Sequence, residues 1–252
     1  MDRFGLYARY YDLLYKDKDY HGEAQYIHQL IKLYRPAAAA LLNLGCGTGK
    51  HDYLLARLGY SVTGVDISEE MSSQAISNVP VDVSSQLNFL TADIRKLSLK
   101  KTFDAVVSLF HVFSYQVSNE DAAAVMETAY RHLEVNGIFI FDCWYGPGVL
   151  TEAPEVRVKR MSDEAITVTR LAEPVVHSMQ NVVDVNYTIN INQNGSDETA
   201  ELKELHKMRY FFVPEIELLI QNKFKLLSVN EWLKATEPTI NSWNAVFVLQ
   251  KI

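Results

Sequence analysis

The sequence contains little that would indicate a disulfide-bonded, metal-bound or membrane-inserted protein. It has two cysteines in 252 residues, Cys46 and Cys143, and neither belongs to a C-x-x-C pair, so neither a disulfide framework nor a structural zinc site is predicted. No run approaches the ~18 apolar residues of a membrane span, and the N-terminus lacks a basic region followed by an apolar stretch. We therefore expect reduced thiols, no resident metal, no membrane association and a cytoplasmic location.

The chain also lacks an excess of basic residues. Its 24 Lys and Arg stand against 31 Asp and Glu, which gives a formal net charge of -7. Sequence-independent nucleic-acid binding depends on Lys and Arg that neutralise phosphates, so this balance argues against a nucleic-acid partner. An apolar content of 48% and a charged content of 22% are ordinary for a globular protein. The length fits one large α/β domain, or one domain with an insertion.

A glycine-rich turn is the strongest signal that is present. An apolar run over residues 40–44 leads into Gly45, Gly47 and Gly49, and a second apolar run ends at Asp66. This layout is typical of a mononucleotide-binding half, in which the glycines let the backbone approach a ligand and the acid binds a ribose diol. The spacing is G-x-G-x-G and not G-x-G-x-x-G, which disfavours a nicotinamide-dependent reductase. The alternatives are that the glycines only connect a strand to a helix, and that Asp66 only starts a turn.

Hydrophobic periodicity predicts alternating strands and helices over the first 150 residues. The expected helices cover residues 4–16, 20–34, 50–58 and 119–133, with another that begins after Ser68. The expected strands cover residues 40–44, 61–65, 87–90, 103–109 and 138–141, the last after a turn at Asn136-Gly137. Strands separated by helices indicate right-handed crossovers and a parallel sheet.

The pattern changes after Gly146-Pro147-Gly148. Residues 155–170 and 182–191 alternate between apolar and polar, and Asn194-Gly195 is a hairpin signal with a partner strand through about residue 212. These features predict an antiparallel layer inserted into the parallel domain. A helix over residues 214–222 and two last strands, over 224–233 and 243–249, are expected after it.

With these motifs in place, the chain from about Tyr7 to its end resembles the class I S-adenosylmethionine (AdoMet) methyltransferases. More narrowly it resembles the sugar N-methyl- and N,N-dimethyltransferases and related small-molecule N-methyltransferases, through Tyr7-Ala8-Arg9-Tyr10-Tyr11-Asp12-Leu13-Leu14-Tyr15, Lys18-Asp19-Tyr20 and the insertion. The resemblance implies an α/β fold with a Rossmann-like seven-stranded sheet, mostly parallel with a reversed last strand, and an inserted antiparallel β layer. It implies an N-terminal helical cap (1–36), an AdoMet-binding core (37–150), an insertion on the acceptor or dimer side (151–213), and a last helix and strands that complete the core sheet (214–252).

The same resemblance implies a set of residues that contact AdoMet. Asp66 would bind the ribose diol, Asp93 the exocyclic amine of adenine, and the backbone N–H of Ile94 its ring nitrogen. The other implied contacts are Tyr11, Tyr20, Asn43, Gly45, Cys46, Gly47, Gly49, Ile67, Met71, Ala92, Leu109 and Phe110. Two alternatives stay open here: Asp93 can cap the segment that follows it, and the tyrosines can form an ordinary aromatic face between packed helices.

Position 43 departs from the family pattern. The family usually has an acid two residues before the first glycine, whereas this chain has Asn43. An amide oxygen can still accept a hydrogen bond from the amino group of AdoMet. The bond is no longer charge-assisted, and charge-assisted bonds are roughly twice as strong as neutral ones. The sequence thus predicts either a weaker AdoMet site or another acid that compensates.

The acceptor side is predicted from residues that follow the fourth strand. His111 and Tyr115, with Tyr11, are the candidate catalytic residues, and His111 would accept a proton from an amine or orient the acceptor. His111 can equally be a hydrogen-bonded histidine of the core, and Asp142 can line the acceptor pocket or cap a loop. Basic residues of the insertion can bind a diphosphate or form a solvated face: Arg157, Lys159, Arg160, Lys203, Lys207 and Arg209.

The sequence therefore predicts an AdoMet-dependent methyltransferase that acts on a small-molecule acceptor. The favoured acceptor is the amino group of an amino sugar, including a nucleotide-linked one. The alternatives are methylation of a hydroxyl or carboxyl group on another metabolite, and an AdoMet-binding protein without catalysis. A monomer or a homodimer is expected, because strands such as those of the insertion readily pair across subunits.

Overall fold

The computed structural model describes residues 10, 13–195 and 199–252, which form two compact units. The larger unit contains Tyr20–Glu152 and Tyr210–Ile252, and the smaller one contains the described residues before Tyr20 together with Ala153–Arg209. The expected N-terminal cap is thus divided, with the helix α2 (Tyr20–Tyr34) in the larger unit. None of the helices in the described part of the chain has the length and apolar character that a membrane span requires.

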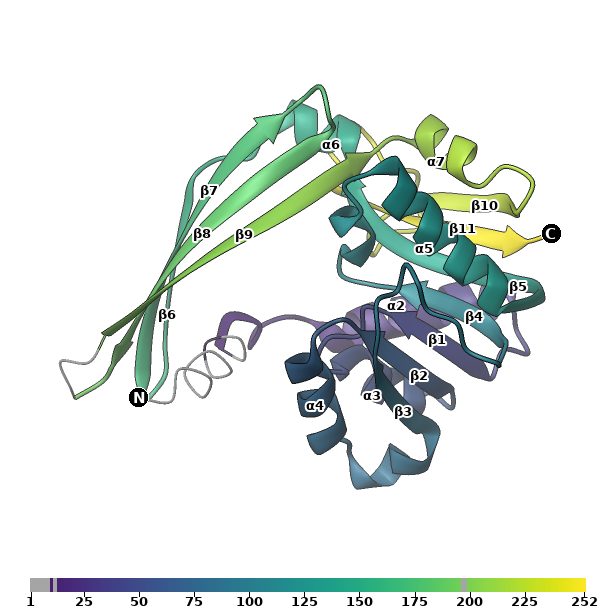
Figure 1. Ribbon diagram of the computed structural model, residues 1–252, viewed down its shortest axis with the longest axis horizontal. Helices are drawn as coiled ribbons and strands as arrows, with labels where there is room; N and C mark the ends of the chain where they lie inside the picture. Colours follow the sequence, from purple (N-terminus) through teal and green to yellow (C-terminus); the bar gives the residue numbers. More distant parts are fainter. Residues whose placement is uncertain (1–9, 11–12, 196–198) are drawn as a thin grey trace. The chain divides into compact units, whose positions relative to one another are not determined.

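The larger unit is built on a mixed sheet (Figure 1). Five parallel strands come first in the chain: β1 (Ala40–Leu44), β2 (Ser61–Asp66), β3 (Leu87–Thr91), β4 (Phe103–Ser108) and β5 (Leu133–Tyr145). The last two strands are β10 (Phe224–Glu231) and β11 (Asn244–Lys251). The spatial order is β3-β2-β1-β4-β5-β11-β10, with β11 antiparallel to both of its neighbours. The predicted sheet with a reversed last strand is therefore confirmed.

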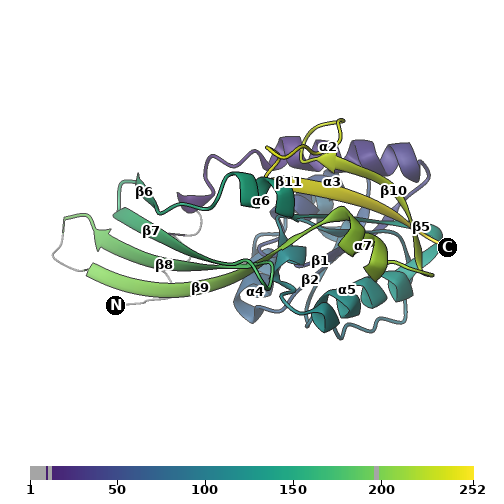
Figure 2. The ribbon, with the colours of Figure 1, turned by 90° about the horizontal axis from the view of Figure 1, so that it is seen from above.

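Helices cover both faces of this sheet, as the alternation along its buried strands requires. On one face, Leu41 and Val107 pack with Ile27 and Ile31 of α2 and with Leu55 of α3 (Lys50–Arg57). On the other face, the next residues along the strands pack against two other helices, α5 (Asn119–His132) and α7 (Val213–Leu219). Figure 2 shows α2 and α5 on opposite sides of the strands. The remaining helices of this unit are α4 (Glu69–Ser77), η1 (Val81–Gln86), η2 (Val112–Tyr115) and α6 (Gly146–Thr151).

One local prediction is wrong. The Asn136-Gly137 pair does not turn the chain into a strand; β5 already begins at Leu133 and runs through it. Asn136 adopts a left-handed conformation, with φ of 60°, and the pairing of β4 with β5 shifts register near this point. Asparagine tolerates this backbone region better than most residues, so the pair forms an irregularity within the strand. The long strand ends at Tyr145, next to the first turn of α6.

The smaller unit is an antiparallel meander. Its strands are β6 (Arg157–Ser162), β7 (Ile166–His177), β8 (Val182–Gln193) and β9 (Thr199–Phe211). Tyr10 and Leu14 pack against one face, on Ile166, Val168, Ile189 and Ile191. The predicted antiparallel layer is confirmed. Strand β9 belongs to both units, because its last two residues pair in parallel with β5.

Candidate functional site

The three glycines at the end of β1 all adopt left-handed backbone conformations. Their φ angles are 85°, 55° and 75° for Gly45, Gly47 and Gly49. Residues with a Cβ pay a steric penalty in this region, which glycine does not. The turn is fixed to the neighbouring strand, because the N–H groups of Gly45 and Cys46 both donate to the carbonyl oxygen of Val65, at 2.7 and 3.0 Å. The local sequence thus dictates a tight turn at the carboxyl edge of the sheet.

Two of these glycines have very different surroundings. A Cβ on Gly45 would lie 2.5 Å from a methyl group of Val112, so a glycine is needed there for packing. A Cβ on Gly47 would meet nothing within 4 Å. The backbone at Gly47 is therefore open on that side, as expected where a ligand approaches the main chain.

The Asp66 carboxylate is oriented by two backbone groups at the end of β2. Its Oδ2 accepts a hydrogen bond from the N–H of Gly47 at 2.8 Å, and its Oδ1 accepts one from the N–H of Ser68 at 2.9 Å. Each carboxylate oxygen has a further acceptor position, so both can also bind hydroxyl groups. Ile67 follows and is 66% exposed, which places an apolar side chain in the open beside the acid. Asp66 and the glycine turn, separated by twenty residues, thus form one structure.

Beneath the turn lies a buried amide–acid pair that the sequence did not reveal. The Nδ2 of Asn43 donates to the Oδ1 of Asp52, in the first turn of α3, at 2.9 Å. Both side chains are buried, and burial raises the pKa of Asp52 to about 7. The other acceptor atoms of the pair, Asn43 Oδ1 and Asp52 Oδ2, have no hydrogen-bond partner within residues 10, 13–195 and 199–252. A ligand that carries N–H donors or a positive charge suits these atoms.

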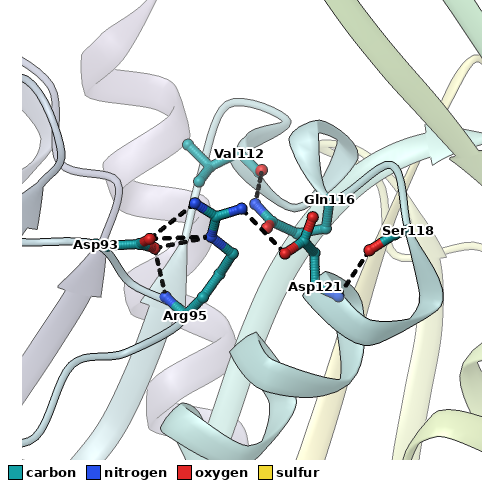
Figure 3. A network of polar contacts seen from close by, with 6 residues as sticks. All are labelled: Asp93, Arg95, Val112, Gln116, Ser118 and Asp121. Atoms are coloured by element: carbon teal, nitrogen blue, oxygen red, sulfur yellow. Dashed lines mark hydrogen bonds and ion pairs between the residues drawn. The ribbon is translucent and has the colours of Figure 1, made fainter.

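The Asp93 carboxylate is held by an arginine (Figure 3). Arg95 donates from Nε and Nη2 to the two carboxylate oxygens, at 2.9 and 2.7 Å, and its Nη1 donates to Asp121 of α5 at 3.0 Å. The Arg95 guanidinium holds the pKa of Asp93 below its usual range. Asp93 is thus an anion, fixed between the loop after β3 and α5. Its expected contact with an adenine amine stays a prediction, and such a contact would share the carboxylate with Arg95.

The remaining predicted cofactor residues differ in their burial. Ile94 and Leu109 are buried and pack into the hydrophobic core on either side of the sheet. Cys46 is also buried, and this burial raises the pKa of its thiol. Met71, Ala92 and Phe110 are half-buried. Tyr11 lies outside the described residues, so its two predicted roles have no structural counterpart here.

Tyr20 belongs to a cluster at the start of α2. Its ring makes an edge contact with His51, with ring centroids 5.0 Å apart, and Lys50 lies over its face. His51 in turn lies 2.6 Å from the buried carboxylate of Glu23. This cluster fixes α2 against the first turn of α3, directly after the glycine turn. The predicted contact of Tyr20 with a cofactor stays a prediction.

His111 lies at the end of β4, in contact with an acid from the neighbouring strand. Its Nδ1 is 2.6 Å from the Oδ2 of Asp142, and its backbone N–H donates to the same oxygen at 3.1 Å. Asp142 is fully buried, whereas the His111 side chain is 20% exposed. Phe110 and His111 both have left-handed backbones, with φ of 64° and 61°. Such strain in bulky residues is typical of functional sites.

The His111–Asp142 pair adjoins the glycine turn. Val112 follows His111, and its side chain is the one that excludes a Cβ at Gly45. Tyr115, three residues further on, is 45% exposed. The site thus has an acid that suits hydroxyl groups, two buried acceptors that suit a cation, and a histidine whose Nδ1 lies 2.6 Å from a buried acid. This arrangement can bind a nucleoside with an amino-acid group and accept a proton nearby.

The basic residues of the insertion are mostly exposed. Arg157, Lys159 and Arg160 lie on β6, which is exposed along most of its length. Lys203 lies 3.4 Å from Glu201, and Lys207 lies 3.9 Å from Asp184. Arg209 is the exception, since it is 6% exposed. Their predicted role in binding a diphosphate stays a prediction.

Comparison with known proteins gives this site its class. A family model for a methyltransferase domain matches residues 41–137, which include the glycine turn, Asp66, Asp93 and His111. The chain contains a methyltransferase domain. This domain, and the fold that the chain shares with AdoMet-dependent methyltransferases, make AdoMet its cofactor. The unpaired acceptors beneath the turn and the open backbone at Gly47 fit the ammonium and ribose ends of this cofactor.

Several similar proteins act on amino sugars. The chain is 28% identical to dTDP-3-amino-3,4,6-trideoxy-alpha-D-glucopyranose N,N-dimethyltransferase of Streptomyces venezuelae, over 84% of this chain and 86% of that protein. It is 29% identical to dTDP-3-amino-3,6-dideoxy-alpha-D-glucopyranose N,N-dimethyltransferase of Streptomyces fradiae, over 75% and 72%. The AdoMet-bound structure of CalS10, an amino pentose methyltransferase of Micromonospora echinaspora, superposes with a TM-score of 0.77 at 22% identity, and the match covers 98% of this chain and 96% of that one.

The surroundings of the glycines predict that two matched substitutions differ in their effects on stability and on ligand binding. Gly45→Ala should lower the free energy of unfolding by about 2 kcal/mol or more, since its Cβ collides with Val112 and its backbone is left-handed. Gly47→Ala should lower it by only about 1 kcal/mol but should greatly weaken binding of S-adenosylhomocysteine (AdoHcy), because its Cβ occupies the open side of the turn. Urea denaturation and calorimetric titration measure the two effects. Equal stability losses would contradict the assignment.

Proposed function

We propose that this protein methylates the amino group of a small molecule, with a nucleotide-linked amino sugar as the favoured acceptor. The observation that carries the proposal is the contact of His111 with buried Asp142, beside the glycine turn. An amine is a nucleophile only when it has lost its proton, so a base close to the cofactor favours an amine acceptor. The dTDP-amino-sugar N,N-dimethyltransferases among the relatives support the sugar nucleotide as its carrier.

AdoMet supplies the electrophilic methyl group on its sulfonium. Asp66 would hold the ribose hydroxyls, and Asn43 would accept a hydrogen bond from the α-ammonium. Asp142, 2.6 Å from Nδ1 of His111, would select the tautomer that carries its proton on Nδ1, which leaves Nε2 to accept a proton from the acceptor ammonium. Alignment of donor and acceptor supplies much of the remaining acceleration. The chain's own residues thus bind, orient and take up one proton.

The proposal is tested by incubating the protein and AdoMet with a panel of acceptors. The panel contains dTDP-linked amino sugars, the same sugars without the nucleotide, and hydroxyl and carboxyl compounds of similar size. We expect mass spectrometry to show one or two added CH2 groups on the dTDP-linked amines, and AdoHcy as the coproduct. Methylation only at hydroxyl or carboxyl groups would favour the second candidate acceptor class. AdoHcy binding without any product would favour an AdoMet-binding protein without catalysis.

The role of the insertion on the acceptor or dimer side is part of the same proposal. So are the cytoplasmic location and the monomeric or homodimeric state. The panel addresses the first of these, because a preference for the nucleotide-linked amine over the free amine requires a group that recognises the diphosphate or the base.

A further inference from the structure

Asp52 is a buried acid that has no cationic partner among the described residues. It is fully buried at the start of α3, and it accepts a hydrogen bond from Asn43 through one oxygen only. Among the described residues, the charged group that acts on the pKa of Asp52 is Asp66 on β2, which is another acid.

The described neighbours whose pKa values respond to Asp52 offer no cation either. Cys46 of the turn and Tyr53 of α3 lie close enough for the Asp52 charge to raise their pKa values. Glu23, which α2 brings nearby, is paired with His51.

A core position does not require such an arrangement. A buried carboxylate without a cation is costly, and an amide or an apolar side chain would avoid the penalty. Asn43 adds a second unsatisfied acceptor, since its Oδ1 is buried without a partner in the part of the chain that the structure describes. While Asp52 is ionised it can only accept, so the NH2 group of Asn43 must face it and the Oδ1 must face away. The pair thus has a fixed direction: the NH2 group of Asn43 faces Asp52, and the acceptor Oδ1 points away from it.

We propose that Asp52 is a positioning residue that supplies, from beneath the glycine turn, the negative charge absent at position 43, and that it acts on the α-ammonium of the cofactor through Asn43. The inference rests on the cofactor contacts proposed above. Asp52 fixes the amide orientation in which Oδ1 can accept from the ammonium, and its charge attracts the ammonium.

The proposal predicts that cofactor binding depends on pH. Burial raises the pKa of Asp52 to about 7. A protonated Asp52 would donate its O–H to Asn43 Oδ1, which requires the amide to turn and removes the acceptor from the ammonium. A bound ammonium favours the ionised acid, so binding should release a proton below this pKa. The Kd for AdoHcy should therefore rise as the pH falls.

The experiment is calorimetric titration of the full chain with AdoHcy between about pH 6 and pH 8. For the natural protein we expect a Kd about tenfold higher at the lower pH, within the limit of tenfold per pH unit for one proton. Asp52→Asn keeps the shape and a hydrogen bond but removes the charge, so its Kd should be about tenfold higher at pH 8 and nearly independent of pH. Asp82→Asn is the matched control, because Asp82 is an exposed acid paired with Arg57.

A double substitution and a stability measurement separate positioning from a structural role. Asn43→Asp combined with Asp52→Asn exchanges the acid and the amide, so it should recover most of the affinity that Asp52→Asn loses. Because the folded-state pKa is raised, Asp52 favours folding at low pH, and that contribution is lost as the pH rises to about 7. Asp52→Asn should therefore raise the thermal midpoint at pH 8, whereas an acid that only stabilises a helix N-terminus would make it fall.

The outcomes distinguish this inference from the function on which it rests. If the natural protein does not bind AdoHcy at all, the cofactor site itself is wrong. If it binds AdoHcy with the same Kd across the pH range, or if Asp52→Asn binds as tightly as the natural protein, the cofactor site stands and the role of Asp52 is wrong. The pH series on the natural protein needs no variant, so a variant that does not fold leaves the test intact.

Discussion

Asp66→Ala is expected to raise the Kd for AdoHcy at least about a hundredfold. Among the described acids near the glycine turn, Asp66 is the only one whose two carboxylate oxygens both accept hydrogen bonds from backbone N–H groups. Hydrogen bonds that involve a charged group contribute roughly 1.5–3 kcal/mol each, and two bonds to the ribose diol therefore correspond to about two or more powers of ten. The substitution also releases the N–H of Gly47, which loosens the turn.

Calorimetric titration measures this effect, with thermal unfolding as a check that the variant folds. Asp66→Asn should give an intermediate result, because its amide retains one acceptor oxygen but directs an NH2 group at a backbone donor. Asp82→Ala is the control, an exposed acid on η1 that should leave the Kd unchanged. A Kd for Asp66→Ala within about threefold of the natural protein would rule out the ribose contact.

His111→Ala is expected to lower kcat for an amine acceptor by about a hundredfold or more, with little change in the Kd for AdoHcy. General base catalysis by a positioned side chain contributes typically 10²–10⁴-fold. The Asp142 carboxylate lies 2.6 Å from Nδ1 of the ring, so Asp142→Asn should cause a smaller loss in the same direction. Because the acceptor amine loses its proton spontaneously at high pH, the deficit of His111→Ala should shrink as the pH rises.

Steady-state kinetics across a pH series test this prediction. A second histidine–acid pair, His177 with Asp184 at 3.3 Å on β7 and β8, supplies the matched control. His177→Ala should leave kcat unchanged. If His111→Ala keeps full kcat at neutral pH, or if its loss does not depend on pH, His111 orients the acceptor or supports the fold and is not the base.

The sequence was informative where the relevant contacts are local or follow sheet geometry. The glycine turn and Asp66 could be predicted because two neighbouring parallel strands end at the same edge, and the spacing from Gly45 to Asp66 reports that geometry. The reversed last strand was expected from the resemblance to the methyltransferases, and the pairing of β11 confirms it. His111 and Asp142 were both expected at this edge, but their contact was not, since it depends on the left-handed backbone of Phe110 and His111.

Other features depend on packing that no local pattern reports. Asp52 resembles an ordinary acid in the first turn of a helix, and only its burial against β1 distinguishes it. Arg95, which binds Asp93, also donates to Asp121, on a helix that begins more than twenty residues later. The short helix α6 was not expected after Gly146-Pro147-Gly148, because these residues usually mark a break. A usable sequence signal for the buried Asn43–Asp52 pair was the occurrence of Asn43 on the strand together with an acid in the first turn of the helix that follows.

The packing of Tyr10 and Leu14 has a consequence for the order in which the protein is made. Their apolar partners, Ile166 to Ile191, leave the ribosome about 150 residues later than they do. At synthesis rates of roughly 5–20 residues per second, Tyr10 and Leu14 remain without these partners for about ten to thirty seconds. During this interval the cofactor-binding strands β1 to β5 can already be made. The nascent chain therefore has its parallel strands before Tyr10 and Leu14 acquire their final neighbours, so the packing of these two side chains belongs to a late step of maturation.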